Sequence, residues 1–372
     1  MRVESPARSF SGSYAADDVT FLLKPVHIEP VPTAAKERLI QSGERHYSEM
    51  LSEEKLPSAR YLELFEDAMA ANAARMADDV VRLARTLLAE RAGGEIVLVS
   101  LARAGTPLGV LLRRALLRLD PRGGAPHYSV SIIRDRGIDA AALDHIRARH
   151  DERAIVFVDG WTGKGAITRE LHRSVAAYND ARGAHVPPRL AVLADLAGVA
   201  DVAATAEDYL IPSSILNSVV SGLVSRTVLN DQVVAPGEFH ACRYYAEYQA
   251  HDRSRLFVDR IGALVEDALH DPALGPVSWA REHAARLRRQ SERFVRETME
   301  RFHLTDANRV KPGIGESTRA LLRRLPECLL LRDAAGADVR HLAHLAAEAG
   351  VPIQVEPALP YRATAIIQTL GE

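Results

Sequence analysis

Runs of consecutive apolar residues alternate with amphipathic segments through the first half of the chain. Such short apolar runs are typical of strands that are buried on both faces, as in parallel sheets. Between 59 and 91, apolar side chains such as Leu62, Phe65 and Met69 recur about every 3.6 positions, which predicts one or two long helices. Strands are expected at 95–100, 128–133, 154–158 and 190–195, and further helices at 108–119, at 140–149 and from about 166.

This order of elements predicts an α/β domain. Parallel strands need long crossover connections, and the predicted helices between the strands supply them. We therefore expect a doubly wound parallel sheet with helices on both faces, formed by residues 58–252. The carboxyl ends of its strands would lie on one edge, where open sheets of this kind bind ligands.

The last third of the chain has a different pattern. Residues 253–309 are dense in Arg and Glu and contain two Pro breaks, which predicts a helical connector. Residues 310–372 are expected to form a small domain of alternating helices and strands. Its expected elements are a helix from 315, a strand at 328–331, a helix at 339–349 and strands at 352–355 and 364–368.

Two other segments are unusual. Residues 1–57 have little regular periodicity and are expected to form an N-terminal arm. Within it, the run 41–50 gathers hydroxyls, a His and charges, so the arm either wraps the core or folds over a site. The stretch 207–227 mixes hydroxyls with apolar residues, so it either packs on itself through side-chain to backbone bonds or lines a ligand pocket.

Composition argues against a strongly charged nucleic-acid or membrane binder, a cysteine-based metal site and a membrane-spanning protein. The 372 residues have a formal net charge of −2, so no overall field attracts nucleic acid or an anionic membrane. The two cysteines, Cys242 and Cys328, lie far apart and form no metal-binding spacing. We also find neither a signal-peptide pattern nor a run of roughly 20 apolar residues. We therefore expect a cytoplasmic protein without a membrane span.

The turn after the third predicted strand has the composition of a phosphate site. Asp159 follows the apolar run, and three glycines let the backbone turn before the next helix begins. Exposed backbone N–H groups, a helix N-terminus and a Lys together attract a phosphate. The spacing is not that of a Walker ATPase loop, and a tight turn without a ligand is the alternative. The expected phosphate-binding residues are Thr162, Gly163, Lys164 and Gly165.

Two further turns are expected at the same edge of the sheet. The first follows the strand at 95–100 and contains Ser100, Arg103, Ala104 and Gly105. The second follows the strand at 128–133 and places Arg134 and Asp135 together; it is either a solvated loop or part of the site.

The Asp159 turn resembles the 5-phosphoribosyl diphosphate loop of type I phosphoribosyltransferases. The resemblance implies a phosphoribosyltransferase-like fold, a 5-phosphate on 162–165, ribose or metal at Asp159, and pyrophosphate with Mg²⁺ near the turn at 100–105 and Arg134. Gly160 stands where that family has a second acid. The catalytic set implied in this way is Asp159, Arg134 and Asp135.

A second resemblance covers residues 9 to about 260. Phe-Ser-Gly-Ser-Tyr, Ile-Ile-Arg-Asp-Arg-Gly-Ile-Asp and Val-Asp-Gly-Trp-Thr-Gly-Lys-Gly look like motifs of a bacterial family found with tellurite-resistance and stress genes. That family has two competing labels, a phosphoribosyltransferase-like protein and a cysteine protease called StiP. A protease would use Cys242 as nucleophile, with His240 as the candidate base, unless folding brings His46 or His127 to the cysteine instead.

The C-terminal segment resembles RNA binders of the L7Ae and Pelota type, which read a kinked RNA with a Gly-x-Asn-Glu-x-x-Lys/Arg turn. Gly315 takes the place of the Asn here. The residues that the resemblance assigns to RNA are Gly313, Gly315, Glu316, Arg319, Arg323 and Arg324.

Our principal prediction from the sequence is a phosphoribosyltransferase-like enzyme that binds phosphoribosyl diphosphate or a related sugar phosphate with Mg²⁺. Its C-terminal domain would bind RNA, and its physiology would be stress or tellurite resistance. One alternative is a cysteine protease that uses Cys242. The other is a non-catalytic regulator that binds nucleotides or RNA. No metal ligands are identified directly.

Overall fold

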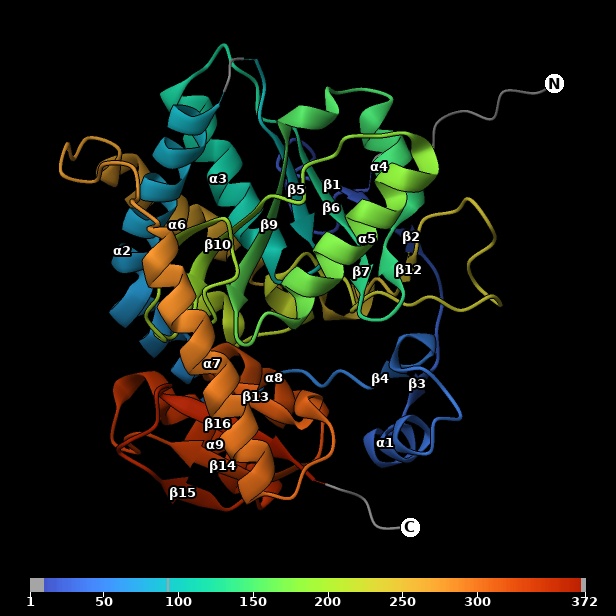
Figure 1. The fold of residues 1–372 in the computed structure, drawn as a ribbon, viewed down its shortest axis with the longest axis vertical. Coiled ribbons are helices and arrows are strands. Elements are labelled where there is room, and N and C mark those ends of the chain that lie inside the picture. Colours follow the sequence, from blue (N-terminus) through green and yellow to red (C-terminus); the bar gives the residue numbers. More distant parts are fainter. Residues whose placement is uncertain (1–9, 92–93, 369–372) are drawn as a thin grey trace.

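The computed structural model describes residues 10–91 and 94–368. Within them, the α/β domain contains a sheet of six strands, and every neighbouring pair in it is parallel (Figure 1). This arrangement confirms the predicted α/β domain with a central parallel sheet. In spatial order, the strands are β1 (Thr20–Leu22), β6 (His127–Val130), β5 (Val97–Leu101), β9 (Ile155–Thr162), β10 (Leu190–Asp195) and β11 (Val202–Thr205).

Helices cover both faces of this sheet, because alternate residues of the central strands point to opposite sides. Leu98 of β5 belongs to the core that contains helices α2 and α3, whereas its neighbours Val97 and Val99 belong to the core that contains α4 and α5. Helix α6 packs against α2 and α3. The bounds are α2 (Ala59–Glu90), α3 (Gly105–Leu119), α4 (Ala140–Arg147), α5 (Ala166–Arg182) and α6 (Ser254–Ala268).

The arm contributes to the structure in two ways. Its strand β1 forms the edge of the main sheet, and its helix α1 (Thr33–Gln41) lies beside the C-terminal domain (Figure 1). The Glu37 carboxylate of α1 accepts hydrogen bonds from Arg324 of that domain, at 3.0 Å for Nη2. Short elements complete the arm: β2 (Lys24–Pro25), β3 (Pro30–Val31), η1 (Tyr47–Glu49) and β4 (Leu51–Ser52).

The remaining segments of the α/β domain contain mostly turns and short elements. In the segment between β11 and α6, side chains are largely buried although few residues are in strands or helices. The short elements are β7 (Ile132–Ile133), β8 (Gly137–Ile138), η2 (Glu152–Ala154), η3 (Pro212–Ser214), η4 (Ser218–Val220), β12 (Ala241–Cys242) and η5 (Ala246–His251).

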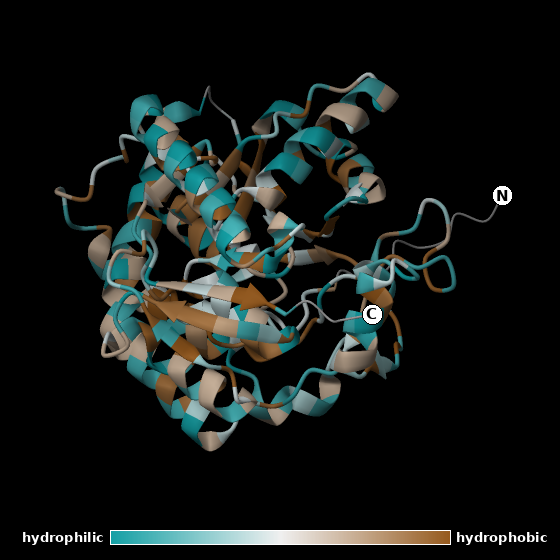
Figure 2. Cartoon of the chain, turned by 60° about the horizontal axis from the view of Figure 1, so that its bottom comes forward, coloured by the Kyte–Doolittle hydropathy of each residue, from teal (hydrophilic) through white to brown (hydrophobic). Residues whose placement is uncertain are grey.

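The C-terminal domain is a four-stranded mixed sheet in the order β13-β16-β14-β15. Helices α8 and α9 pack on one face of this sheet, and apolar side chains of α7 pack on the other. In Figure 2 the strands are mostly brown, because their side chains form the apolar cores. The elements are α7 (Arg281–Arg301), η6 (Ala307–Arg309), β13 (Val310–Pro312), α8 (Ile314–Arg323), β14 (Pro326–Leu331), η7 (Ala337–Val339), α9 (Arg340–Ala349), β15 (Ile353–Val355) and β16 (Ala363–Ile367).

Asp208 joins the two domains. Its carboxylate accepts hydrogen bonds from the backbone N–H of Ile314 at 2.9 Å and of Arg362 at 2.7 Å. Burial raises the pKa of Asp208 to about 6, because the side chain lies between the domains, away from water. The N-terminal end of α8 therefore has its capping acceptor in the other domain.

Several elements differ from the sequence-based expectations. Strand β9 continues to Thr162, beyond the expected end at 158, so Asp159 lies within the strand. Strand β1 lies in the arm, for which little regular structure is expected, and β11 is not among the predicted strands. Both are short edge strands: β1 pairs with β6, which is remote in the sequence, and β11 follows its partner β10 after a short loop. Strands this short give a weak signal in the sequence alone. None of the helices in the described residues is long and apolar enough to span a membrane.

Candidate functional site

The predicted turns do meet at the carboxyl edge of the sheet. A Cβ on Gly105, at the start of α3, would lie 2.1 Å from the Val158 carbonyl oxygen of β9, so only glycine permits this approach. A Cβ on Gly160 would lie 3.3 Å from the carbonyl oxygen of Ala104. The turn after β5 and the end of β9 are therefore in direct contact, as expected for a parallel sheet.

The side chains of the first turn, however, are already paired. Ser100 Oγ donates to the Gly105 carbonyl at 3.0 Å and lies 2.8 Å from His127 Nε2. The Arg103 guanidinium makes two hydrogen bonds with Glu54, at 3.1 and 3.0 Å, and is buried. The Arg103 charge is thus neutralised inside the protein.

The predicted phosphate loop contacts the C-terminal domain. A Cβ on Gly163 would lie 2.8 Å from the Pro312 carbonyl oxygen. Lys164 Nζ donates to the carbonyls of Ala307 and Val310, the latter at 2.6 Å. Burial, followed by repulsion from Lys311, lowers the pKa of Lys164 well below its usual value. The rest of the loop has structural roles: Thr162 Oγ1 donates to Asp195, and Gly165 has a φ of 76° before α5.

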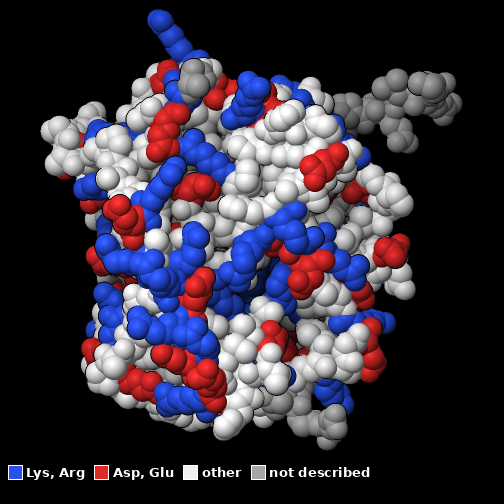
Figure 3. Space-filling model, in the orientation of Figure 1, with Lys and Arg blue, Asp and Glu red and all other residues white. Residues whose placement is uncertain are grey.

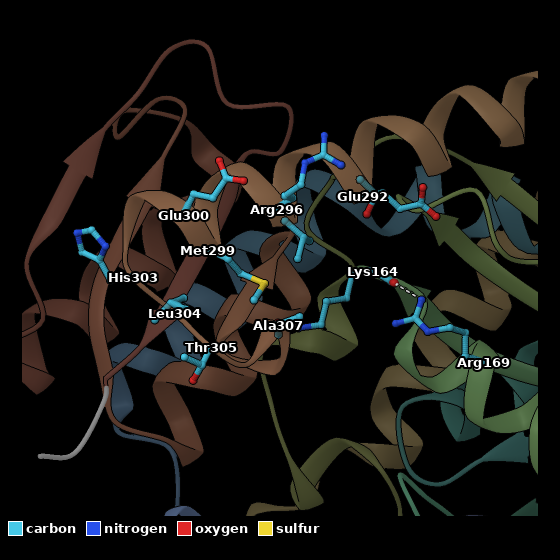
Figure 4. Close-up of a pocket in the computed structure, with 12 residues that line it drawn as sticks. Lys164, Arg169, Glu292, Arg296, Met299, Glu300, His303, Leu304, Thr305 and Ala307 are labelled. Carbon is cyan, nitrogen blue, oxygen red and sulfur yellow. Dashed lines mark hydrogen bonds between the residues drawn. The ribbon is translucent and has the colours of Figure 1, made fainter. Parts of the chain in front are cut away.

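A cavity of about 630 Å³ lies beside α7. In Figure 4, Lys164 lies at the wall of this cavity, between Arg169 and Ala307. Arg169 donates to the Lys164 carbonyl at 3.1 Å. Lys164 lines both this outer cavity and a second one, which lies between the domains.

This second cavity, of about 320 Å³, is called the junction pocket below. Its wall contains the β9–α5 turn, part of the arm and one face of α8. Eight cationic side chains line it: Lys36, Arg134, Lys164, Arg226, Lys311, Arg319, Arg323 and Arg324. Only three carboxylates of the described residues do so: Asp159, Asp306 and Glu316.

The indole of Trp161 lies where the two predicted motifs meet. A Cβ on Gly315 would lie 2.3 Å from Trp161 Cε2, so this glycine lets α8 contact the ring with its backbone. The Arg319 guanidinium is 4.4 Å from the ring centroid, a distance typical of a cation–π interaction. The phosphate turn and the RNA-binding turn, predicted in separate domains, thus lie against each other.

Asp159 is buried, whereas Asp135, in the turn after β7, is exposed. Burial raises the pKa of Asp159 to about 6, while Arg319 and the backbone N–H of Gly160 favour its ionised form. Arg134 also lines the junction pocket, but Asp135 does not. The Asp135 side chain is exposed and pairs with Arg134 Nε at 3.2 Å.

Cys242 is buried and lacks the geometry of a nucleophile in this state. Burial raises the pKa of the Cys242 thiol to about 12, and its side chain belongs to an apolar core. Within the described residues, no hydrogen bond joins its sulfur to a histidine; His240 Nδ1 instead lies 2.8 Å from Ser131 Oγ. Cys328 is also buried, in β14.

Sequence reasoning missed six charged or aromatic residues of the junction pocket as individual site residues: Lys36, Tyr47, Trp161, Arg226, Asp306 and Lys311. The run 41–50 does fold over this site, because Tyr47 lines the pocket and its ring lies 5.1 Å from the Arg134 guanidinium. The stretch 207–227 also lines pockets, through Arg226 here and residues 215–219 in a neighbouring cavity.

Residues 12–262 match the family model described as tellurite-like stress resistance cysteine protease StiP. The chain therefore belongs to the StiP family. A relative named cysteine protease StiP, from Acinetobacter baylyi, is 47% identical over 98% of this chain and 96% of its own length. The resemblance inferred from the sequence motifs is thus confirmed. Residues 289–369 match the PELOTA RNA binding domain model, which begins within α7.

Two solved structures show a weaker similarity. A glutamine mutant from an analysis of an invariant aspartic acid in HPRTs is 15% identical, covering 49% of this chain and 92% of that one, with a TM-score of 0.24. A Trypanosoma cruzi hypoxanthine phosphoribosyltransferase with the product IMP is 17% identical, covering 51% and 86%, with a TM-score of 0.23. Similarities of this size support no function.

These comparisons overturn our principal prediction from the sequence. The family model and the full-length relative are both named for a cysteine protease, so the phosphoribosyltransferase interpretation is wrong. The paired Arg103 and the covered loop at Gly163 agree with this correction, because neither is free to bind phosphoribosyl diphosphate. Mg²⁺ was expected only as the partner of that ligand and stays a prediction.

Proposed function

We propose that the protein is a cysteine protease with Cys242 as its nucleophile. The observation that carries this proposal is that Cys242 is the one cysteine in residues 12–262, the segment that matches the protease family model. Cys328 lies in the C-terminal domain, outside that segment. The 47% identical relative with the same family name supports the proposal over the full length of the chain.

The described state corresponds to a latent enzyme, because a thiol with a pKa of about 12 is protonated at neutral pH. Catalysis would require β12 to open. This strand has two residues and pairs with the two-residue strand β2; its one further bridge within the described residues joins Val228 and Ala241. Short elements with few ladder hydrogen bonds open at a low free-energy cost.

His240 is the proposed general base. It lies two residues from Cys242, and burial lowers the pKa of its imidazole below the usual value of 6.5. The ring is therefore neutral at pH 7 and able to accept the thiol proton after β12 opens. Ser131 Oγ, at 2.8 Å from Nδ1, fixes the orientation of the ring.

The test compares Cys242→Ala with Cys328→Ala, since both positions are buried cysteines. Cleavage of casein and labelling by iodoacetamide are measured for the full chain, with and without mild urea to favour local opening. We expect Cys242→Ala to abolish both cleavage and the labelling that urea induces, and Cys328→Ala to retain cleavage. Cleavage by Cys242→Ala at the wild-type rate would refute the proposal.

We propose RNA binding as a second function, located at the C-terminal domain. The observation that favours it, beside the match to an RNA-binding domain model, is a band of Lys and Arg across the junction of the two domains (Figure 3). Such a band compensates phosphates even though the overall charge is nearly zero.

RNA binding is tested by mobility shift with a structured RNA at several salt concentrations. We expect the full chain to bind RNA with an affinity that falls as salt rises, because each neutralised phosphate releases counterions. Replacing Arg319 by Gln should reduce the affinity, whereas Arg340→Gln, an exposed residue outside the junction pocket, is the charge-matched control. No binding at low salt, about 50 mM, would refute this second proposal.

A further inference from the structure

Most basic side chains of the junction pocket form no ion pair with a carboxylate of the described residues. Three are paired: Arg134 with Asp135 at 3.2 Å, Arg319 with Glu316 at 3.3 Å, and Arg324 with Glu37. In the part of the chain that the structure describes, no ion pair joins a carboxylate to the others, which are Lys36, Lys164, Arg226, Lys311 and Arg323.

The hydrogen-bond partners of these side chains in the described residues are neutral. Lys36 Nζ donates to Ser52 Oγ at 2.7 Å, and Arg226 donates to backbone carbonyls of the arm, including that of Tyr47 at 2.5 Å. Arg323 donates to Asn217 Oδ1. Lys311 Nζ makes no hydrogen bond within the described residues. These groups satisfy the donors in part, and the carboxylates of Glu54 and Glu316 favour the charged forms of Arg226, Arg323 and Lys311 without forming ion pairs with them.

The clustered charges repel one another. Burial, followed by the charges of Arg226 and two neighbouring arginines, lowers the pKa of Lys36 to about 6. Burial also lowers the pKa of Lys311 to about 8, although Glu316 opposes the shift. Burying basic side chains close together costs free energy, and an anion beside them would lower this cost.

We propose that the junction pocket binds a phosphate group that carries two or more negative charges. A phosphate supplies several acceptor oxygens and no obligatory donor, which matches the basic side chains of Lys36, Arg226, Lys311 and Arg323 in this wall. Lys36 is neutral near pH 7 and would take up a proton beside a bound anion. A single carboxylate would leave most of these charges uncompensated. This proposal does not depend on the proposed protease activity. It rests on the proposed RNA binding only if the phosphate belongs to an RNA.

The proposed anion does not lie on the predicted phosphate loop. Gly163 faces Pro312, and Lys164 is held by carbonyls of the C-terminal domain. The available donors come instead from α1, from the segment after η4 and from the C-terminal domain, through Lys36, Arg226 and Lys311. The site is thus built from three parts of the chain and exists only when the two domains are in contact.

The experiment uses the full chain and inorganic pyrophosphate as the probe, measured by calorimetry and by thermal shift at constant ionic strength. The test variant is Lys311→Met with Arg323→Gln, and the control is Arg340→Gln. We expect pyrophosphate to raise the melting temperature of the wild type and the double variant to bind at least about tenfold more weakly, because charged hydrogen bonds are lost. The control should bind as the wild type does.

The unliganded double variant checks folding. Because it removes mutually repelling charges, it should melt at or above the wild-type temperature, and weakened binding then reflects the site. Equal stabilisation by chloride, or undiminished pyrophosphate binding by the double variant, would overturn the proposal.

Two RNA arms identify the source of the phosphate. If an RNA end occupies the pocket, 5′-phosphorylated RNA should bind more tightly than the same RNA with a 5′-hydroxyl, and pyrophosphate should compete with it. If pyrophosphate binds but does not change RNA binding, the ligand of the pocket is a small free phosphate compound. In that case the pocket binds phosphate even if the protein does not bind RNA.

Discussion

Gly315→Ala tests the contact between the two domains most directly. The added Cβ would lie 2.3 Å from Trp161 Cε2 and 2.6 Å from Cζ2. Carbon atoms in contact prefer separations of about 3.5–4.0 Å, so the ring or α8 must move by about 1 Å. The indole cannot move freely, because Arg319 lies 4.4 Å from its centroid.

The size of the effect follows from two opposing contributions. Overpacking of this kind costs about 1–3 kcal/mol, and replacing a helical glycine by alanine returns about 0.5–1 kcal/mol. Gly315 lies in the first turn of α8, where that return is at its smallest. We therefore expect Gly315→Ala to lower the free energy of unfolding by about 1–2 kcal/mol.

The assay is urea unfolding followed by far-UV circular dichroism, which does not depend on tryptophan fluorescence. Gly275→Ala is the matched control, because a Cβ at Gly275 would meet no atom within 4 Å. Repeating the substitution in a Trp161→Ala background removes the atoms that clash. In that background Gly315→Ala should cost nothing, which gives a coupling free energy of about 1–2 kcal/mol between the two positions.

Two outcomes would refute the reasoning. A change below about 0.5 kcal/mol for Gly315→Ala alone would mean that the interface adapts without cost. An equal cost with and without the indole would mean that Trp161 is not the cause of the effect.

Three further predictions concern other parts of the structure. Asp208→Ala leaves two backbone N–H groups of the C-terminal domain without acceptors, so the free energy of unfolding should fall by about 2–4 kcal/mol. Trypsin should then cleave the variant between the domains; a variant that resists trypsin as well as the wild type does would contradict this prediction. The pKa of Lys36 is lowered to about 6 in the folded protein from an ordinary value of 10.5, so the unfolded chain binds one more proton between about pH 7 and pH 9 and stability should rise with pH. Lys36→Met should reduce that rise by about 1.4 kcal/mol per pH unit. If urea unfolding gave the same pH dependence of stability for the variant and the wild type, the lowered pKa of Lys36 would be refuted. Tyr14→Phe removes the hydrogen bond from Oη to the Val220 carbonyl at 3.0 Å and should cost about 1 kcal/mol in the same assay; no loss would show that the carbonyl finds another donor.

The junction also restricts how RNA could reach the C-terminal domain. Gly313 and Gly315, the residues assigned to RNA by resemblance, pack against Leu196 and Trp161 of the other domain. Arg319 lies over the same indole. An RNA that used the whole turn would have to separate the domains, whereas one that entered the junction pocket would not. The predicted RNA-binding role of these residues stays a prediction.

Much of the fold follows from local sequence patterns. The buried strands around Val99 and Phe157 were predicted because continuous apolar runs leave no polar face for water. The 32-residue helix α2 was predicted because its apolar residues repeat with the helical period. Strand β11, with four residues, was missed because so short a strand has no distinctive pattern.

The site was predicted less well, because it depends on contacts between distant segments. The sequence marked Asp159 and the glycines of the following turn, but it could not show that Glu54 neutralises Arg103. Nor could it show that carbonyls of β13 and η6 hold Lys164. A basic residue has the same local signature whether it is paired or free, so only the three-dimensional arrangement identifies the available charges.

By itself, the sequence determined the alternation of strands and helices, the division into an α/β part and a small C-terminal part, and the family through its motifs. These properties depend on short-range periodicity and on residue identity. The tertiary structure alone decided that the phosphate turn and the RNA-binding turn lie against each other around Trp161. It also decided that Lys36, Arg226 and Lys311 share one pocket with few carboxylates. The physical reason is that packing and charge compensation act through space between residues that are remote in the chain.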